Sequence, residues 1–282
     1  MSETPDSAAP YSSAPPPAAA PPRMTAPAFA ALKEAGEKIA MVTAYDDPTA
    51  RWADEAGIDG VLVGDSLSMV VQGRENTLHV SLEEMIYHAE IVGRAVRHAL
   101  TVVDLPFPLS HLGPLRAIES ASRILQQTRC QAVKLEGGSE QAEVIAALAR
   151  AGIPVMAHCG LRPQSIHQLG GYRVQRNEAA LLQDAQSAVE AGAFAIVLEC
   201  IPAPLARRIT QTTPIPTIGI GAGPDCDGQV LVMHDVLGLS RGRTPKFVKT
   251  YARLGQEAVS ALQQFRREVR AGDFPATEHS YR

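Results

Sequence analysis

Short apolar runs alternate with longer segments of helical periodicity along most of the chain. From residue 27 onward, each run of β-branched and aliphatic residues is followed by a loop of Gly, Asp, Ser or Pro, and then by Ala and Leu at helical spacing. Such alternation predicts parallel strands, because each helix returns the chain to the same edge of the sheet. The expected strands are residues 39–43, 60–63, 100–104, 132–136, 154–158, 195–199, 217–220 and 230–234.

Helices are expected between these strands at residues 48–56, 82–95, 115–127, 140–151, 178–191 and 203–210. Eight strand–helix units in a chain of 282 residues favour closure into an α/β (β/α)8 TIM barrel over an open sheet. Residues 246–270 predict a C-terminal helical extension, with Leu254, Val259, Leu262 and Phe265 on one stripe. That stripe is expected to pack against the barrel or a neighbouring subunit.

Composition adds a domain division and excludes several classes of function. Residues 1–26 are rich in Ala, Pro and Ser, which predicts a disordered tail before a single catalytic domain at 27–282. A formal net charge of −4 argues against a nucleic-acid partner. The sequence has neither an apolar run long enough for a membrane span nor an export signal. Cys130, Cys159, Cys200 and Cys226 lack paired spacing, so a reducing, cytoplasmic location is expected.

Charged or polar residues follow five of the expected apolar strands, at the strand ends where parallel barrels carry their chemistry. In chain order they are Asp65 with Ser66, Asp104, Lys134 with Glu136, His158, and Glu199. Lys134 and Glu136 are two residues apart, so they face the same side of their strand. Asp65, Asp104 and Glu136 offer hard oxygen ligands from three neighbouring strands, which suits Mg2+.

Each of these residues also has an ordinary structural interpretation. Asp65 or Asp104 taken singly would serve equally well as a helix N-cap. Glu136 would serve as an exposed loop acid, and Lys134 as a snorkelling or ion-paired lysine. His158 is as consistent with a hydrogen-bonded core residue as with one that orients a substrate. The group as a whole favours a site, because crowded, desolvated charges are costly unless a cation or ligand compensates them.

Two glycine-containing segments leave alternatives open. Residues 218–223 lack the G-x-G-x-x-G spacing of a dinucleotide loop, so they predict a tight turn or a close approach of the backbone to a ligand. Residues 170–172, Gly-Gly-Tyr, predict either a lid over the site or an ordinary surface turn.

A series of short segments resembles the ketopantoate hydroxymethyltransferase family. They are residues 42–46, 62–67, 104–107, 133–138, 163–165, 170–172, 197–200, 218–223, 227–229, 234–235, 245–247 and 278–280. The resemblance implies transfer of a hydroxymethyl group from 5,10-methylenetetrahydrofolate to 3-methyl-2-oxobutanoate, through a Mg2+-stabilised enolate, in pantothenate synthesis. It also implies large homo-oligomers, typically decamers built from two five-membered rings.

The resemblance further implies a role for each strand-end residue. Asp65, Asp104 and Glu136 would surround Mg2+, and Glu199 would be the general base. The oxo acid would be bound by Asp65, Ser66, Asp104 and Lys134, with Ser66 and Lys134 holding its carboxylate.

Two other functions are compatible with such a barrel. A metal-dependent oxo-acid enzyme of the isocitrate lyase or phosphonomutase type shares the Gly-Asp-Ser strand end, but it typically needs a cysteine loop that this sequence lacks. A barrel that had lost catalysis would bind methylenetetrahydrofolate without turnover, and its charged set would show gaps. No gap is visible in the strand-end residues.

Overall fold

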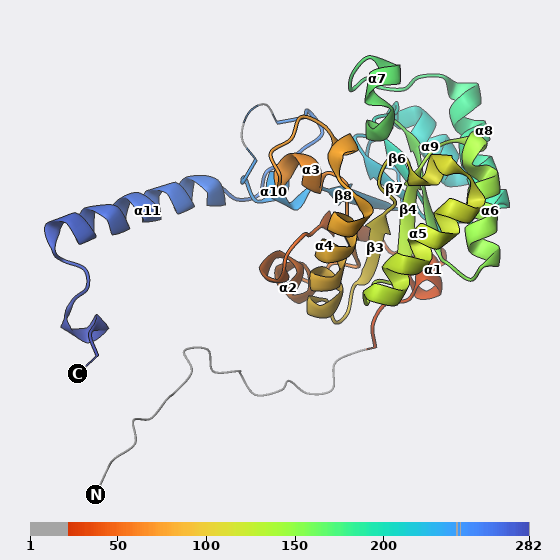
Figure 1. Cartoon of the computed structure of the whole chain (residues 1–282). Helices are drawn as coiled ribbons and strands as arrows, with labels where there is room; N and C mark the ends of the chain where they lie inside the picture. Colours follow the sequence, from red (N-terminus) through yellow and green to blue (C-terminus); the bar gives the residue numbers. More distant parts are fainter. Residues whose placement is uncertain (1–21, 241, 243, 282) are drawn as a thin grey trace, which may run out of the picture.

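The computed structural model describes residues 22–240, 242 and 244–281, and it confirms the expected closed barrel of eight parallel strands (Figure 1). Each strand pairs with the next along the chain, and the last pairs with the first. The strands are β1 Ile39–Thr43, β2 Gly60–Val63, β3 Leu100–Asp104, β4 Ala132–Glu136, β5 Val155–Gly160, β6 Ala195–Glu199, β7 Thr217–Ile220 and β8 Gly228–Leu231.

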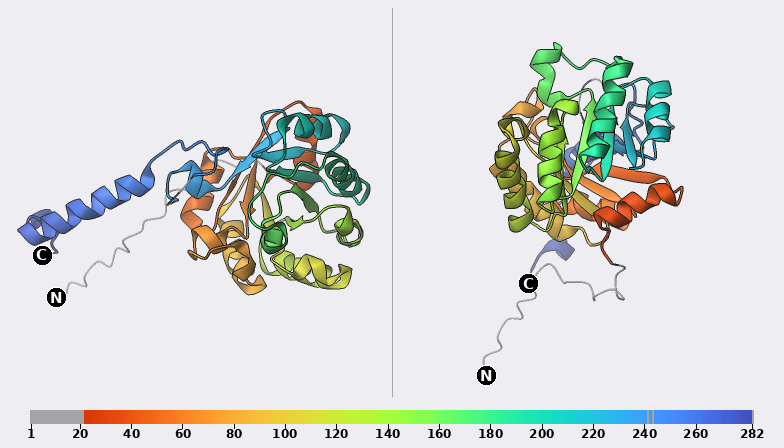
Figure 2. Two further views of the ribbon diagram at one scale, coloured as in Figure 1. Left: turned by 90° about the horizontal axis from the view of Figure 1, so that it is seen from above. Right: turned by 90° about the vertical axis from the view of Figure 1, so that its right-hand side faces the viewer.

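Helices surround this barrel on its outer face, as the view along the barrel in Figure 2 shows. The longer ones are α1 Ala26–Glu34, α2 Asp47–Glu55, α4 Leu82–Ala95, α5 Pro114–Gln127, α6 Ala142–Arg150, α8 Glu178–Glu190, α9 Ala203–Thr212 and α11 Leu254–Ala271. Single turns form α3 Leu67–Val70, α7 Ile166–Leu169 and α10 Met233–Val236. Short 3-10 turns are η1 Thr77–His79, η2 Leu109–Leu112, η3 Ser139–Gln141, η4 Pro163–Ser165 and η5 Thr277–His279.

Three expectations about element boundaries were wrong. The last strand is β8 at Gly228–Leu231 rather than 230–234, because the chain turns into α10 where Met233 N–H donates to Thr43 Oγ1 at 3.1 Å. β5 covers Val155–Gly160 rather than 154–158, so it ends two residues later than the apolar run predicts. Residues 246–253 are not helical, so the C-terminal helix begins at Leu254.

The barrel has the two apolar layers that its strand pattern predicts. Inward-facing residues such as Leu100, Val102 and Met156 fill the barrel interior. Outward-facing residues pack against the surrounding helices. Phe29 of α1 joins the inner layer, fully buried, and meets Phe194 edge-on at 5.9 Å between ring centroids. α1 therefore closes the end of the barrel opposite the carboxyl ends of the strands.

The N-terminal segment is attached to the barrel before α1 begins. Arg23 donates to Arg129 O at 2.9 Å and to Thr101 Oγ1 at 2.7 Å, and Met24 N–H donates to His98 O at 2.6 Å. The segment expected to be disordered, 1–26, is therefore ordered from Arg23 onward. Residues 1–21 lie outside the described part.

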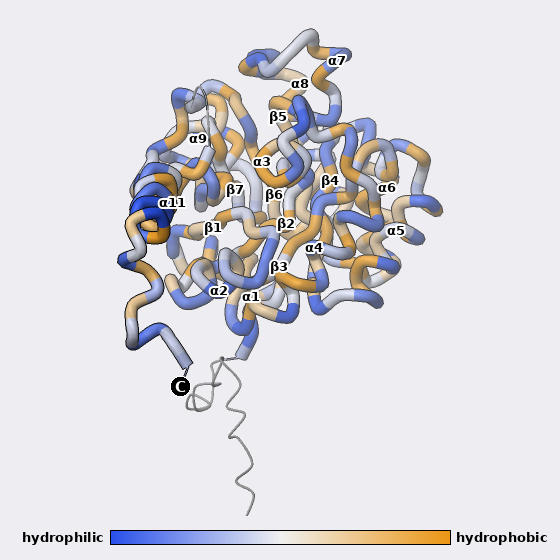
Figure 3. The backbone as a smooth tube through the Cα atoms, turned by 60° about the vertical axis from the view of Figure 1, so that its left-hand side comes forward, coloured by the Kyte–Doolittle hydropathy of each residue, from blue (hydrophilic) through white to orange (hydrophobic). Residues whose placement is uncertain are grey.

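α11 extends away from the barrel instead of packing against it (Figure 1). None of its residues is buried, and Leu262 and Phe265 are 67% and 52% exposed. Figure 3 shows both hydrophilic and hydrophobic colours on α11. Of the two partners expected for its apolar stripe, the barrel of the same chain is thus excluded. Among the described helices, neither α11 nor any other has the length and apolarity that a membrane crossing requires.

Candidate active site

Strand register brings the polar strand ends to one level. Asp104 of β3 lies beside Lys134 of β4, Glu136 beside His158 of β5, and Gly160 of β5 beside Glu199 of β6. In a parallel barrel these are the carboxyl ends, and side chains that face inward there surround a common space.

That space is a cavity of about 580 Å3 at the carboxyl ends of the strands. All the strand-end residues singled out from the sequence line it: Asp65, Ser66, Asp104, Lys134, Glu136, His158 and Glu199. We call these seven residues the floor of the cavity. Segments that follow α7 and α10 form its mouth.

Asp65, in the turn after β2, lies beside Asp104 at the end of the neighbouring strand β3. The backbone N–H of Asp65 donates to Asp104 Oδ2 at 3.1 Å, and both side chains are buried. Gly64 leaves the space that this arrangement needs, since a Cβ at Gly64 would lie 2.9 Å from Ser66 Oγ and 3.4 Å from Asp104 Oδ2. Neither acid caps a helix, so the N-cap interpretation is wrong for both.

Lys134 lies between an acid and a histidine. Its Nζ is 2.9 Å from Asp104 Oδ1 and 3.2 Å from His158 Nδ1, and the side chain is buried. Burial opposes its charge, but the carboxylates of Asp104, Glu136 and Asp65 outweigh burial and raise the pKa of the ammonium group. Lys134 is therefore an ion-paired, charged lysine at the floor of the cavity.

Gln164 of η4 joins two of the acids, and sequence reasoning missed it. Its backbone N–H donates to Glu136 Oε2 at 2.9 Å, and its Nε2 donates to Asp65 Oδ2 at 2.9 Å and to Leu105 O at 3.0 Å. Glu136 is buried by this contact, so its interpretation as an exposed loop acid is wrong. The only sequence signal for Gln164 was its position within residues 163–165 of the family resemblance.

His158 connects Lys134 to Glu199. Burial and the positive charge of Lys134 lower the pKa of His158, so the ring is neutral at neutral pH. A neutral ring whose Nδ1 accepts from Lys134 carries its proton on Nε2, which lies 3.3 Å from Glu199 Oε2. Nε2 has no hydrogen-bond partner among the described residues, so its contact with Glu199 is a close approach to the carboxylate and not an aligned hydrogen bond. The Glu199 side chain is 15% exposed, so it is accessible from the cavity.

Ser66 is fixed from the opposite side of the floor. Its Oγ lies 2.7 Å from the hydroxyl of Tyr45, a fully enclosed residue that follows β1. Burial raises the pKa of Tyr45, so its hydroxyl keeps its proton and either oxygen can donate.

Negative charge exceeds positive charge at the floor. Burial and the neighbouring Asp104 raise the pKa of Asp65 to about 7, and burial with the neighbouring Asp65 raises the pKa of Glu136 well above its ordinary range. Such crowding is what a bound cation relieves. Among residues 22–240, 242 and 244–281, no three His, Cys, Asp or Glu side chains converge as a preformed metal cage.

The donor chemistry nevertheless fits Mg2+. This ion commonly takes only one or two protein carboxylates and completes its octahedron with water and substrate oxygens. Asp65 and Asp104, adjacent and buried, supply such a pair. The three-acid set that includes Glu136 stays a prediction.

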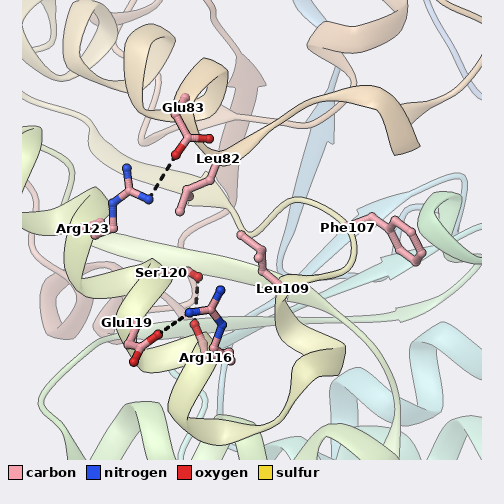
Figure 4. Close-up of a pocket in the computed structure, with 8 residues that line it drawn as sticks. All are labelled: Leu82, Glu83, Phe107, Leu109, Arg116, Glu119, Ser120 and Arg123. Atoms are coloured by element: carbon pink, nitrogen blue, oxygen red, sulfur yellow. Dashed lines mark hydrogen bonds and ion pairs between the residues drawn. The ribbon is translucent and has the colours of Figure 1, made fainter.

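A second hollow, of about 280 Å3, lies on the outside of the barrel between α4 and α5. Figure 4 shows its charged side chains paired with one another: Arg123 with Glu83 at 3.1 Å and Arg116 with Glu119 at 2.8 Å. Because these exposed pairs satisfy their own charges, this hollow is a poorer candidate for an anionic substrate than the cavity at the strand ends.

The chain is similar to known proteins over most of its length. Residues 23–277 match the sequence profile of a family described as ketopantoate hydroxymethyltransferase. A relative from Rhodopirellula baltica is 54% identical, covering 89% of this chain and 93% of its own, and one from Moorella thermoacetica is 55% identical, covering 91% and 97%. Both are named 3-methyl-2-oxobutanoate hydroxymethyltransferase.

Among solved structures, similar folds occur at low sequence identity. A phosphonopyruvate hydrolase in complex with oxalate and Mg2+ superposes with a TM-score of 0.60 at 15% identity, covering 91% of this chain and 93% of its own. A 2,3-dimethylmalate lyase of the PEP mutase/isocitrate lyase superfamily gives 0.59 at 18%, covering 92% of each chain. At this identity the likeness concerns the fold alone.

Proposed function

Because the chain belongs to the ketopantoate hydroxymethyltransferase family, we propose that it transfers a hydroxymethyl group from 5,10-methylenetetrahydrofolate to 3-methyl-2-oxobutanoate, giving 2-dehydropantoate for pantothenate synthesis. The observation that carries this proposal is the set of acids and one lysine at the floor of a single cavity, in a chain more than half identical to relatives of that name. An oxo acid carries one negative charge and gains a second when it is deprotonated, so it would be stabilised by Lys134 and by a cation that the acids hold.

Asp65 and Asp104 would hold Mg2+, with Glu136 close behind them. When bound, the ion would neutralise the negative charge that develops on the keto oxygen. Lys134 and Ser66 would hold the substrate carboxylate, since both present donors toward the cavity and each is anchored from behind by another side chain. The remaining substrate carbons would then lie toward Glu199.

Glu199 would remove the proton from C3 of the oxo acid. Its Oε2 lies 3.3 Å from Nε2 of the neutral His158, and its side chain is accessible from the cavity. C3 would then form a bond with the methylene carbon of the folate as the first of that carbon's two bonds to nitrogen breaks. Water would replace the second nitrogen, which supplies the hydroxyl of the product and releases tetrahydrofolate. In this scheme His158 is a positioning residue and Glu199 the catalytic one.

One assay tests the proposal directly. The purified protein is mixed with 3-methyl-2-oxobutanoate, methylenetetrahydrofolate and Mg2+, and 2-dehydropantoate is followed by NMR with an EDTA control. We expect product only when all three are present. Binding of the folate without any turnover would support the non-catalytic alternative, and cleavage of an oxo acid without transfer would support the lyase-like one.

We also propose that the chain acts as a homo-oligomer in a reducing, cytoplasmic compartment, and the family resemblance suggests a decamer. The exposed apolar stripe of α11 supports self-association, because a lone amphipathic helix in water is marginally stable unless its apolar face is covered. The four free cysteines support the compartment. Light scattering that shows a monomer at micromolar concentration would overturn the assembly.

A further inference from the structure

The mouth of the cavity differs chemically from its floor. Residues 172–174, after α7, and 245–247, after α10, line it from two sides. They bring two aromatic rings, Tyr172 and Phe247, which are 48% and 36% exposed. They also bring two cations, Arg173 and Lys246. The floor is acidic, whereas the mouth is aromatic and basic.

Tyr172 lies across the opening, above the acids of the floor. Its hydroxyl reaches Met69 Sδ of α3 at 3.5 Å, on the opposite side of the mouth. Burial raises the pKa of its phenol, and the carboxylates of Asp65, Glu199 and Glu136 raise it further. The ring lines the same cavity as the floor, so a ligand resting on it would extend toward the reacting atoms.

Phe247 forms the other aromatic wall, next to Glu199. Its ring packs over Gly221 at the end of β7, where an added Cβ would lie 2.9 Å from Phe247 Cδ1 and 3.2 Å from Cys200 Sγ. Cys200 follows Glu199 directly in the chain. Any larger residue at Gly221 would push the ring away, so the loop that carries Phe247 depends on this close approach.

The two cations are available to a ligand. Neither Arg173 nor Lys246 forms an ion pair with a carboxylate within the described ranges. Lys134, at the floor of the same cavity, is instead paired with Asp104. The cavity also has room beyond the oxo acid, since pockets for ligands of drug size measure about 300–1,000 Å3 and this one measures about 580 Å3.

We propose that the mouth is the binding subsite for the reduced folate, with its fused ring and aminobenzoyl group against Phe247 and Tyr172 and its glutamate carboxylates at Arg173 and Lys246. Planar rings stack on exposed aromatic faces, and an anionic tail is attracted by unpaired cations. In this orientation the methylene carbon faces inward, toward the oxo acid beside Glu199. The inference rests on the proposed function and adds the location of its second substrate.

Two probes separate the contacts in a binding experiment: tetrahydrofolate, and tetrahydropteroate, which lacks the glutamate. Calorimetric titrations are made with Mg2+ and oxo acid present. The double variant Arg173→Glu/Lys246→Glu should weaken tetrahydrofolate roughly tenfold and leave tetrahydropteroate unchanged. Phe247→Ala should weaken both probes roughly tenfold. Lys249→Glu, in the same loop but outside the cavity lining, is the matched control and should change neither.

A second readout keeps this inference separate from the proposed function. Hydrogen–deuterium exchange at C3 of the oxo acid, followed by NMR without folate, should proceed at the wild-type rate in all three variants, which also shows that they are folded. If the wild type binds tetrahydrofolate and the variants bind it equally well, the subsite is elsewhere. Equal losses for the two probes in the charge variant would overturn the assignment of Arg173 and Lys246. If the wild type binds neither probe, the proposed function itself fails.

Discussion

Lys134 and Glu199 are the two floor residues with the most clearly separable roles. Lys134 is paired and charged before any substrate arrives, so its effect belongs to binding. Glu199 faces a neutral histidine and the open cavity, so its effect belongs to proton transfer.

Glu199→Gln keeps the size of the side chain but removes the proton acceptor. We expect loss of roughly two to four orders of magnitude in the rate of C3 hydrogen–deuterium exchange, the usual contribution of a positioned base, with unchanged binding of the oxo acid. Exchange is measured by NMR without folate. Glu143→Gln, on the exposed face of α6, serves as the control. Exchange at the wild-type rate would move the base to another group.

Asp65 gives the metal-free protein a pH dependence whose sign can be worked out. Its pKa is about 7 in the folded state, against an ordinary value of 3.8, so between these values the folded state holds a proton that the unfolded state has released. Its contribution to stability is therefore present at low pH and lost as pH rises through about 7.

We expect the melting temperature in EDTA to fall across this range, and to fall less steeply in Asp65→Asn. Excess Mg2+ should offset the fall in the wild type, because the ionised carboxylate then has a cation beside it. A melting temperature in EDTA that rises from pH 4 to pH 7 equally in both proteins would contradict the assignment.

Much of the floor could be predicted from the sequence, and the reason is local. Asp65, Asp104 and Glu136 each follow or end an apolar run, and the strand-end rule of parallel barrels then places them together without knowledge of any contact. Gln164 and the direction of His158 could not be predicted this way. Their roles depend on hydrogen bonds to residues distant in sequence, 99 positions apart for Gln164 and Asp65.

At the scale of elements, six strands begin and end where the apolar runs predict, because a buried strand is defined by its own residues. β8 was displaced because its limits are set by neighbours: Gly228 pairs with both Ile39 and Ile218. β7 and β8 are joined directly by residues 221–227, which are too few for a crossover helix.

The junction of β5 and β6 holds Glu199 through Gly160. Gly160 has φ of +99°, and a Cβ there would lie 2.2 Å from Glu199 O. Gly160→Ala should therefore destabilise the fold by about 1–3 kcal/mol from strain and also slow C3 exchange by moving Glu199. Gly152 has φ of +81° and no atom within 4 Å of an added Cβ, so Gly152→Ala carries the strain without the clash.

Chemical denaturation and the exchange assay are run on both glycine variants. Gly152→Ala should lose stability alone, whereas Gly160→Ala should lose stability and exchange. Equal exchange rates in the two variants would show that the position of Glu199 does not depend on the close approach at Gly160.

At the scale of the whole molecule, the apolar residues of α11 stay exposed to solvent within one chain. Phe265→Glu places a charge on its apolar stripe, and we expect this variant to dissociate. Ser260→Glu places the same charge two positions before Leu262, on the opposite face at roughly 100° per residue, and should leave the assembly intact. Light scattering compares the two variants at equal concentration. An intact assembly in Phe265→Glu would exclude the stripe as the interface.

The proposed covering of α11 by a second copy would also link folding to mass action. If α11 is ordered by a neighbouring chain, unfolding releases that neighbour, and dilution favours the unfolded state. The melting temperature of the wild type should then rise with protein concentration, whereas that of Phe265→Glu should not. The stability of this protein would accordingly depend on its concentration, and not on the contacts within one chain alone.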